Sequence, residues 1–548
     1  MNRPAELNEL LRAEAPASAW HPDLFCFGCE APGSLAEPSP DRLGFKAFNL
    51  QRMALLGLPV PPGFVLGTGF CASAKAQAEG ASEAVWRPAL QALQQASGLQ
   101  LGDARRPLLL SVRSGAPVSM PGMMETLLNI GLSDATLDGF VRLTGQPRLA
   151  WDAYRRLVAG FGEVVAGVPA ACFDAELQSL AAGRSERELD FAELRALTRR
   201  FLAVYAEVAG QPFPQDVREQ LRQAIAAVFK SWQSDKACAY RAAHGIADTI
   251  GTAVTVQAMV FGNAGAHSGA GVGFTRDPSS GAPQLWVDFL FNAQGEDVVS
   301  GRRSAHGHTV LAEILPEVWS QLQTASALLE RAFGDMQDFE FTVQDGRLYL
   351  LQTRSGKRMP RAAARIALDL LAQGVIDAGT AQARTAALDA QSMRLQAVLA
   401  ADGEVLRPLA QAASASAGVA VGEIALDEAR ARDRHAAGAK VILVRRDAET
   451  SDMAALEHAA GLLTQHGART SHAAVVARQM GRVCLVGCEA LQIDEGRREL
   501  QLAGQVLAEG DLLTLDGNEG LIYAGAARTE WRDDTALLQA LERLRSTG

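Results

Sequence analysis

The small-residue stretch AASASAGVA, residues 412–420, separates two parts of the chain that differ in pattern. Before it, residues 360–402 are rich in Ala, Leu and Arg at helical spacing, which indicates a helical connector. After it, short apolar runs surround a helical segment, which is typical of a compact α/β unit. A run of small residues favours a flexible joint. Because 548 residues are also too many for one hydrophobic core, we predict about two to four domains.

Composition and charge exclude several classes of protein. The net charge is −10 and no Lys/Arg run stands out, so the chain lacks the footprint of a nucleic-acid-binding protein. No apolar stretch approaches the ~18 residues of a membrane span. Residues 1–19 lack the apolar segment of a signal peptide. The seven cysteines are scattered rather than arranged as a disulfide framework. We therefore expect a cytoplasmic protein with reduced thiols.

Two pairs of cysteines are close in the sequence. Cys26 and Cys29 form a C-x-x-C motif, and Cys484 and Cys488 flank an apolar run. A zinc site of this kind normally combines two pairs at defined spacing, and no second C-x-x-C is present. We therefore expect buried thiols at these positions rather than a metal site.

The motif GARTSHAAVVARQMG, residues 467–481, carries the clearest chemical signal. His472 follows Thr470 and Ser471 and starts an apolar-faced helix that Gly481 can end. A Thr or Ser at the N-cap leaves backbone N–H groups pointing outward, and the helix dipole favours an anion at that end. Imidazole is also a competent nucleophile near neutral pH. On these residues alone, His472 is either a phosphate carrier or simply the first residue of a helix.

The full motif closely resembles the phosphohistidine signature of the phosphoenolpyruvate-utilising family, which includes pyruvate phosphate dikinase. The resemblance implies that His472 carries a phosphoryl group and that Thr470 and Arg469 belong to the catalytic segment. Ala468 and Arg469 replace the Gly-Met pair that is usual in the dikinase. The same resemblance implies that Arg469 places a cation beside the phosphate.

The segment SVRSGAPVSMPGMMETLLNIGL, residues 111–132, predicts a strand that ends at Arg113 and leads into a loop rich in Gly, Pro and Met. Such a loop lets backbone amides approach a polyphosphate, and a guanidinium offers a fixed fork of donors. Ordinary connectors also have this composition. The segment resembles the phosphate-binding segment of the dikinase, which implies nucleotide contacts from Arg113 and Gly122.

Residues 338–358 predict a β-hairpin in which the length of the turn decides which side chains share a face. A two-residue Asp-Gly loop pairs Glu340 with Leu351, which is on the wrong face for a polar cluster. A three-residue loop with a left-handed glycine instead pairs Asp338 with Gln352.

Only the three-residue loop gathers four polar side chains on one surface, namely Asp338, Glu340, Gln352 and Arg354. Two carboxylates, an amide and an arginine together suit a bound Mg²⁺–nucleotide. The alternative is a charged face turned to solvent. The segment resembles the metal-and-nucleotide hairpin of the dikinase's ATP-grasp domain. That resemblance implies Mg²⁺ ligands at Glu340 and Gln352, and phosphate contacts from Arg354.

Further stretches carry the same resemblance. Residues 251–281 and 291–301 are similar to the central sheet and turns of the ATP-grasp domain. The stretch LGFKAFNL stands where the family has a lysine that reaches ATP, which implies this role for Lys46. The implied fold class is a multidomain α/β and α+β protein, with an ATP-grasp domain followed by a swivelling phosphohistidine α/β domain. The expected boundaries are 1–358 for the ATP-grasp nucleotide-binding domain, 359–405 for the helical connector, 406–526 for the phosphohistidine domain and 527–548 for a truncated helical tail.

The resemblance stops near residue 526. The dikinase continues into a barrel that binds pyruvate and phosphoenolpyruvate, and such a barrel needs about 250 residues. The resemblance implies that ATP phosphorylates His472 with release of AMP and that inorganic phosphate is the second acceptor. Because the barrel is not matched, we expect that a separate protein supplies the pyruvate site. One alternative is a phosphotransferase to a different small-molecule acceptor. The other is a non-catalytic nucleotide-binding regulator.

Overall fold

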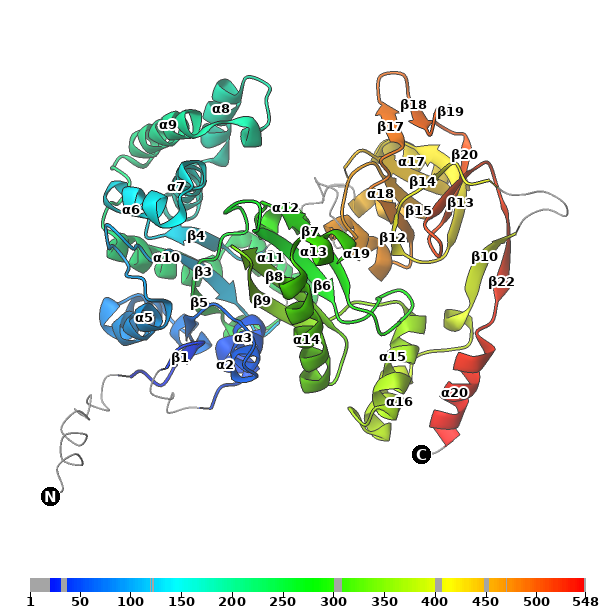
Figure 1. Ribbon diagram of the computed structural model, residues 1–548, viewed down its shortest axis with the longest axis horizontal. Coiled ribbons are helices and arrows are strands. Elements are labelled where there is room, and N and C mark those ends of the chain that lie inside the picture. Colours follow the sequence, from blue (N-terminus) through cyan, green and yellow to red (C-terminus); the bar gives the residue numbers. More distant parts are fainter. Residues whose placement is uncertain are drawn as a thin grey trace. The chain divides into compact units, whose positions relative to one another are not determined.

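The computed structural model describes residues 20–30, 37–118, 120, 123–299, 308–399, 407–447, 453–469 and 471–546. The chain forms two compact units, Met1–Val260 and Phe261–Gly548, and each is described by itself (Figure 1). Among the helices in these ranges, none is long and apolar enough to cross a membrane.

An antiparallel sheet of five strands organises the first unit, with the strands in the order β1-β2-β5-β3-β4. The strands are β1 (Leu24–Phe27), β2 (Gly63–Leu66), β3 (Leu110–Gly115), β4 (Thr126–Ile130) and β5 (Ala253–Ala258). All four residues of β2 and the first five of β5 are buried. The sheet is therefore covered on both faces, as its run of apolar and β-branched residues predicts. The strand predicted to end at Arg113 continues two residues further, to Gly115.

Helices make up most of the rest of the first unit. They are α2 (Pro40–Leu43), α3 (Phe45–Leu55), α4 (Ala74–Gly80), α5 (Glu83–Ser97), α6 (Asp134–Thr144), α7 (Pro147–Phe161), α8 (Ala170–Ala181), α9 (Phe191–Ala209), α10 (Val217–Ser231) and α11 (Asp235–His244). In α10, apolar residues recur at helical spacing on the buried side, and this helix contacts β3, β4 and β5.

The second unit begins with a four-stranded antiparallel sheet in the order β7-β6-β8-β9. Its strands are β6 (Gly269–Phe274), β7 (Trp286–Phe291), β8 (Gln337–Gln344) and β9 (Arg347–Ser355). The accompanying helices are α12 (Gly295–Val299), α13 (His308–Ile314) and α14 (Pro316–Phe333). The predicted hairpin over 338–358 is confirmed as β8 and β9.

The segment after this sheet is only partly helical. Helices α15 (Pro360–Ala372) and α16 (Ala378–Thr385) match the predicted connector, but β10 (Leu395–Leu399) is a strand that pairs with β22 (Arg528–Arg532). The expectation of a helix to residue 402 was therefore wrong at its end. The final helix α20 (Thr535–Ser546) packs through Leu541 and Leu544 against α15 and α16.

An eight-stranded sheet forms the core of the compact α/β unit, in the order β11-β21-β20-β13-β14-β15-β16-β12. Neighbours from β13 to β16 are parallel, and the other pairs are antiparallel. The strands are β11 (Ala410–Gln411), β12 (Ala413–Ser416), β13 (Val419–Ala425), β14 (Val441–Arg445), β15 (Gly461–Thr464), β16 (Val483–Val486), β20 (Leu512–Asp516) and β21 (Leu521–Ala524). Helices α17 (Glu428–Ala436), α18 (Met453–His458) and α19 (His472–Gln479) accompany it, as does a small sheet of β17 (Leu491–Asp494), β18 (Glu499–Leu502) and β19 (Gln505–Ala508).

The expectation of a flexible joint at residues 412–420 was wrong, because this stretch enters the eight-stranded sheet as β12 and the start of β13. Ala415 and Ser416 are fully buried. Small side chains suit flexible linkers, but they equally suit strands that pack closely against a neighbouring helix. Here that helix is α19.

The cysteines divide into two groups. Cys484 and Cys488 are buried, as expected, and belong to the cores on either side of the eight-stranded sheet. Cys26 and Cys29 are only half-buried, so the expectation of buried thiols was wrong for this pair. The reason is their position where β1 ends and the chain returns to the surface.

Candidate phosphoryl-transfer site

The hairpin β8–β9 places four polar side chains on one face of its sheet. Asp338 lies directly opposite Arg354, and Glu340 lies directly opposite Gln352. Arg354 Nε donates to Asp338 Oδ2 at 2.8 Å, and Gln352 Nε2 donates to Glu340 Oε1 at 3.4 Å. The prediction that these four side chains share a face is confirmed.

The turn that produces this face differs from the predicted one. The loop is the two-residue pair Asp345–Gly346, with φ values of 50° and 75°. A regular ladder from this loop would pair Glu340 with Leu351. Instead the register shifts next to Glu340, and Leu351 becomes the extra residue of a β-bulge, so that Gln352 is the partner. The predicted three-residue loop was wrong. The β-bulge at Leu351 has the effect that was expected of the loop, because it brings Gln352 and Arg354 to the same face as Asp338 and Glu340.

Burial sets the electrostatics of the Asp338–Arg354 pair. The Asp338 side chain is 5% exposed and that of Arg354 is 47% exposed. Burial raises the pKa of Asp338, and the neighbouring Arg354 opposes this shift. Because Arg354 binds Asp338 through Nε, the two terminal nitrogens of Arg354 can donate hydrogen bonds to an anion on the exposed side.

The same face continues across β6 and β7. Asp338 lies opposite Phe274, which in turn lies opposite Trp286. Two residues further along β8, Glu340 lies opposite Val272 of β6, and Val272 lies opposite Asp288 of β7. Asp288 is buried. The polar groups of the hairpin therefore share a surface with an aromatic ring and a second carboxylate from β7.

Two glycines of β6 explain why the opposite face is filled by aromatic rings. A Cβ on Gly271 would lie 2.4 Å from the Phe341 ring, and a Cβ on Gly273 would lie 2.4 Å from the Phe339 ring. The rings of β8 therefore lie across the bare backbone of β6. This close approach is open only to glycine.

Helix α19 begins at His472, as predicted, with Ser471 as its N-cap. The Ser471 hydroxyl accepts a hydrogen bond from the Ala474 N–H at 3.4 Å. Ala473 and Ala477 are buried against the eight-stranded sheet, which fixes the helix in place. Thr470 and the side chain of His472 lie outside the described part of the chain.

Arg469 contacts β7, on the same face as the hairpin's polar groups. Its Nε donates to Asp288 Oδ1 at 3.1 Å, and its guanidinium lies 4.0 Å from the centre of the Trp286 ring. An ion pair and a cation–π contact together fix the loop that leads into His472. Within the second unit, the histidine-bearing helix therefore begins beside the surface that carries Glu340 and Gln352.

Arg478, in the last turn of α19, is buried beneath this contact. Its Nε donates to the Ala415 carbonyl at 2.8 Å and its Nη2 to the Arg469 carbonyl at 3.2 Å, while the guanidinium lies 5.6 Å from the Phe274 ring centre. Burial lowers its pKa. Its Nη1 is buried with no hydrogen-bond partner among the described residues.

Lys46 and Arg113 are carried by adjacent elements of the first unit. Lys46 is the second residue of α3, and Arg113 lies on β3. A Cβ on Gly44, which has φ of 72°, would lie 2.0 Å from the Gly115 carbonyl oxygen, so the start of α3 and the end of β3 touch through their backbones. Gly122 lies outside the described residues. The structure therefore brings the elements of Lys46 and Arg113 together.

The metal expectation rests on Glu340 and Gln352. Among the described residues, no group of three or more His, Cys, Asp and Glu side chains could hold a metal ion. Mg²⁺ in nucleotide sites needs fewer protein ligands, because phosphates and water complete its shell. A carboxylate directly opposite an amide, 3.4 Å away, fits such a shell once the amide turns its oxygen inward.

Sequence reasoning missed three residues of this site: Trp286 and Asp288 on the face of the sheet, and Arg478 on helix α19. The strand QLWVDFLF alternates, so Trp286 and Asp288 could have been assigned to one face, but alternation does not tell which face. Arg478 lies six residues after His472 in the same motif. Its burial follows only from the packing of α19 against β12 and the second unit's first sheet.

The sequence matches two family models. One is described as "Pyruvate phosphate dikinase, AMP/ATP-binding domain" and matches residues 82–318 and 308–374. The other is described as "PEP-utilising enzyme, mobile domain" and matches residues 438–520. The first covers Arg113 and the hairpin, and the second covers Arg469, His472 and Arg478.

Curated relatives match most of this chain. Pyruvate, phosphate dikinase of Clostridium symbiosum is 40% identical over 496 residues, which are 89% of this chain and 57% of that protein. The protein of the same name from Rhizobium meliloti (strain 1021) is 42% identical over 524 residues, 92% of this chain and 58% of that protein. The chloroplastic protein of Flaveria pringlei is 41% identical over 494 residues, 88% of this chain and 51% of that protein. The chain thus spans little more than half the length of these relatives.

Proposed function

This chain belongs to the pyruvate phosphate dikinase family, and on that premise we propose that it transfers phosphoryl groups from ATP to His472. It would perform the ATP- and phosphate-dependent part of a reaction in which ATP, phosphate and pyruvate become AMP, diphosphate and phosphoenolpyruvate. One observation supports this best: Arg469, three residues before His472, contacts Asp288 on the face that carries Glu340 and Gln352. This contact supports the proposal that the phosphate carrier and the nucleotide face act together within one unit.

The proposed reaction has two steps. In the first, an imidazole nitrogen of His472 attacks the β-phosphorus of ATP, the bond from that phosphorus to the α,β-bridging oxygen breaks, and AMP leaves. In the second, an oxygen of inorganic phosphate attacks the terminal phosphorus of the pyrophosphoryl group. The bond from that phosphorus to the bridging oxygen breaks, diphosphate leaves, and a single phosphoryl group, which keeps the bridging oxygen, remains on His472.

The chain's own residues would position the phosphates and neutralise their charge. Arg354 would contact phosphate oxygens while its Nε stays bound to Asp338. We assign nucleotide contacts to Lys46, Arg113 and the backbone of Gly122. Apart from the covalent role of His472, the protein would act by positioning and charge neutralisation, so a fixed array of cations would account for much of the rate.

At the histidine, Thr470 and Arg469 would flank the transferring group. Buried Arg478 would add positive potential beside the Arg469 carbonyl, to which it donates. Glu340 and Gln352 would hold Mg²⁺, which when bound neutralises charge on the transferring phosphates. Asp338 would orient Arg354.

Isotopic labelling separates these steps. With ATP labelled in the β-phosphate or in the γ-phosphate, both labels should enter the protein while inorganic phosphate is absent. Added phosphate should then release the γ label as diphosphate and leave the β label on the protein. Retention of the γ label, or labelling from the γ position alone, would contradict a pyrophosphoryl intermediate.

We propose that the final acceptor is pyruvate and that it is bound outside residues 1–548, by a further domain or by a separate protein. Support comes from the relatives, whose names specify pyruvate and which are much longer than the matched region. Incubating labelled protein with pyruvate, alone and with a candidate barrel domain, tests this assignment. Release of label to another small molecule would instead support a different acceptor.

A further inference from the structure

Cys26 and Cys29 form a pair of hydrogen-bonded thiols where strand β1 ends. Cys26 lies on β1 opposite Phe64 of β2, and the chain then bends at Gly28, which has φ of 64°. The two side chains are hydrogen-bonded to each other. Cys29 Sγ also lies 3.9 Å from the Gly63 carbonyl oxygen, so this sulfur is held against β2.

The hydrogen bond makes the two thiols unequal. It stabilises the thiolate of Cys29 and lowers the pKa of that residue, although partial burial opposes the shift. The same hydrogen bond, together with burial, raises the pKa of Cys26. A thiolate next to a thiol that keeps its proton is the arrangement that thiol–disulfide exchange requires, because one sulfur attacks first and the other resolves the product.

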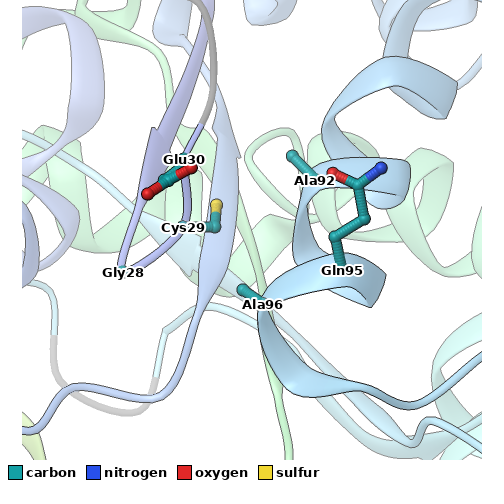
Figure 2. A pocket seen from close by; sticks show the side chains of 6 residues that line it. All are labelled: Gly28, Cys29, Glu30, Ala92, Gln95 and Ala96. Carbon is teal, nitrogen blue, oxygen red and sulfur yellow. The ribbon is translucent and has the colours of Figure 1, made fainter.

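A cavity of about 460 Å³ opens beside Cys29 (Figure 2). One side is formed by the loop after β1 and the other by helix α5. The lining residues are Gly28, Cys29, Glu30, Ala92, Gln95 and Ala96. An amide and a carboxylate set among small side chains suit a compact, polar, peptide-like molecule that presents a sulfur to Cys29.

We propose that Cys26 and Cys29 form a redox-sensitive dithiol that reacts with low-molecular-weight disulfides in this cavity. The Cys29 thiolate attacks one sulfur of the small disulfide, whose S–S bond breaks, and one small thiolate leaves and takes up a proton. Cys26 then loses its proton and attacks Cys29 Sγ. The Cys26–Cys29 bond forms, and the second small thiolate leaves and is protonated. The protein dithiol is oxidised by two electrons, and the small disulfide is reduced to two thiols.

Substitution of each cysteine separates the two halves of this exchange. The probe is glutathione disulfide, added to the purified chain of residues 1–548, with the products located by peptide mass spectrometry. The unchanged chain should form a Cys26–Cys29 disulfide that reduced glutathione reverses. Cys26→Ser should instead accumulate a mixed disulfide on Cys29, and Cys29→Ser should form neither product.

Cys172, half-buried on α8 and outside any C-x-x-C motif, is the matched control. Cys172→Ser should leave the Cys26–Cys29 disulfide unchanged. Glutathione adducts on Cys26→Ser that are no more frequent at Cys29 than at Cys172 would overturn the proposal. A second measurement needs no variant: at pH 7, iodoacetamide should alkylate Cys29 about tenfold faster than Cys172 in the unchanged chain. Equal rates would overturn it as well.

Discussion

Arg478 is a cation that the fold buries while its Nη1 has no hydrogen-bond partner among the described residues. Leaving a buried donor unpaired costs about 1–3 kcal/mol, and more for a charged group. Its Nη2 donates to the Arg469 carbonyl, so the guanidinium lies beside the loop that leads to His472. Under the proposed function, a phosphoryl group on His472 would bring an anion to the start of the same helix and offset part of this cost.

His472→Asn should abolish the transfer of label from ATP to the protein while leaving nucleotide affinity within about twofold. The reason is that one imidazole carries the covalent step, whereas the nucleotide contacts are assigned to other elements. Acid-labile phosphate on the protein and a calorimetric nucleotide titration measure the two effects. His435→Asn, at an exposed position of α17, is the control and should label normally. Acid-labile label that persists on the His472→Asn chain would contradict the proposal that His472 is the phosphorylated residue.

Glu340→Gln should raise the Mg²⁺ concentration needed for half-maximal labelling by about tenfold or more. A neutral amide replaces the only carboxylate of the Glu340–Gln352 pair, so the proposed metal site loses its stronger ligand. High Mg²⁺ should recover part of the labelling. Glu317→Gln, at an exposed position of α14, should leave the Mg²⁺ dependence unchanged. An unchanged dependence in Glu340→Gln would place the metal elsewhere.

Among the elements, the β8–β9 hairpin shows how far pattern alone can go. Alternation correctly grouped Asp338 with Glu340 and Gln352 with Arg354, because the side-chain period of a strand is two. It could not place the bulge at Leu351. The same sequence can form a regular strand or a strand in which one residue has no partner, so alternation does not distinguish the two. The stretch 412–420 failed for a related reason: small residues specify little local structure, and tertiary packing against α19 decided the outcome.

Gly271→Ala should destabilise the β7-β6-β8-β9 sheet by about 1–3 kcal/mol, because the new methyl group would overlap the Phe341 ring. The local free energy of opening, from amide hydrogen exchange of residues 269–274 and 337–344, measures this. Gly295→Ala is the control in the same unit. A Cβ there meets nothing within 4 Å, so its effect should stay within about 0.5 kcal/mol. Equal exchange in both variants would show that the rings can move aside without cost.

At the scale of the whole molecule, the sequence motifs alone predict the helix that begins at His472, the hairpin and the strand of Arg113, because each lies in a continuous segment. Contacts between distant segments could not be foreseen. Arg469 meets Asp288, which is 181 residues earlier in the chain. The end of the chain was expected to be a truncated helical tail. Helix α20 is present and packs against α15 and α16, but it follows strand β22, which pairs with β10. Pairings of this kind depend on topology rather than on local sequence.

The purified chain should exchange label between ATP and AMP but should not make phosphoenolpyruvate from pyruvate. Reversal of the first proposed step needs only His472 and the nucleotide contacts. Pyruvate must be held as its enolate beside a metal and a proton-transfer group in a closed pocket. The described residues after 526 are already engaged with the connector, β22 through β10 and α20 through α15 and α16. Adding a separate pyruvate-binding barrel should restore phosphoenolpyruvate formation in a coupled assay, and His472→Asn should prevent that restoration. Phosphoenolpyruvate made by the chain without any added protein would place the acceptor site within residues 1–548.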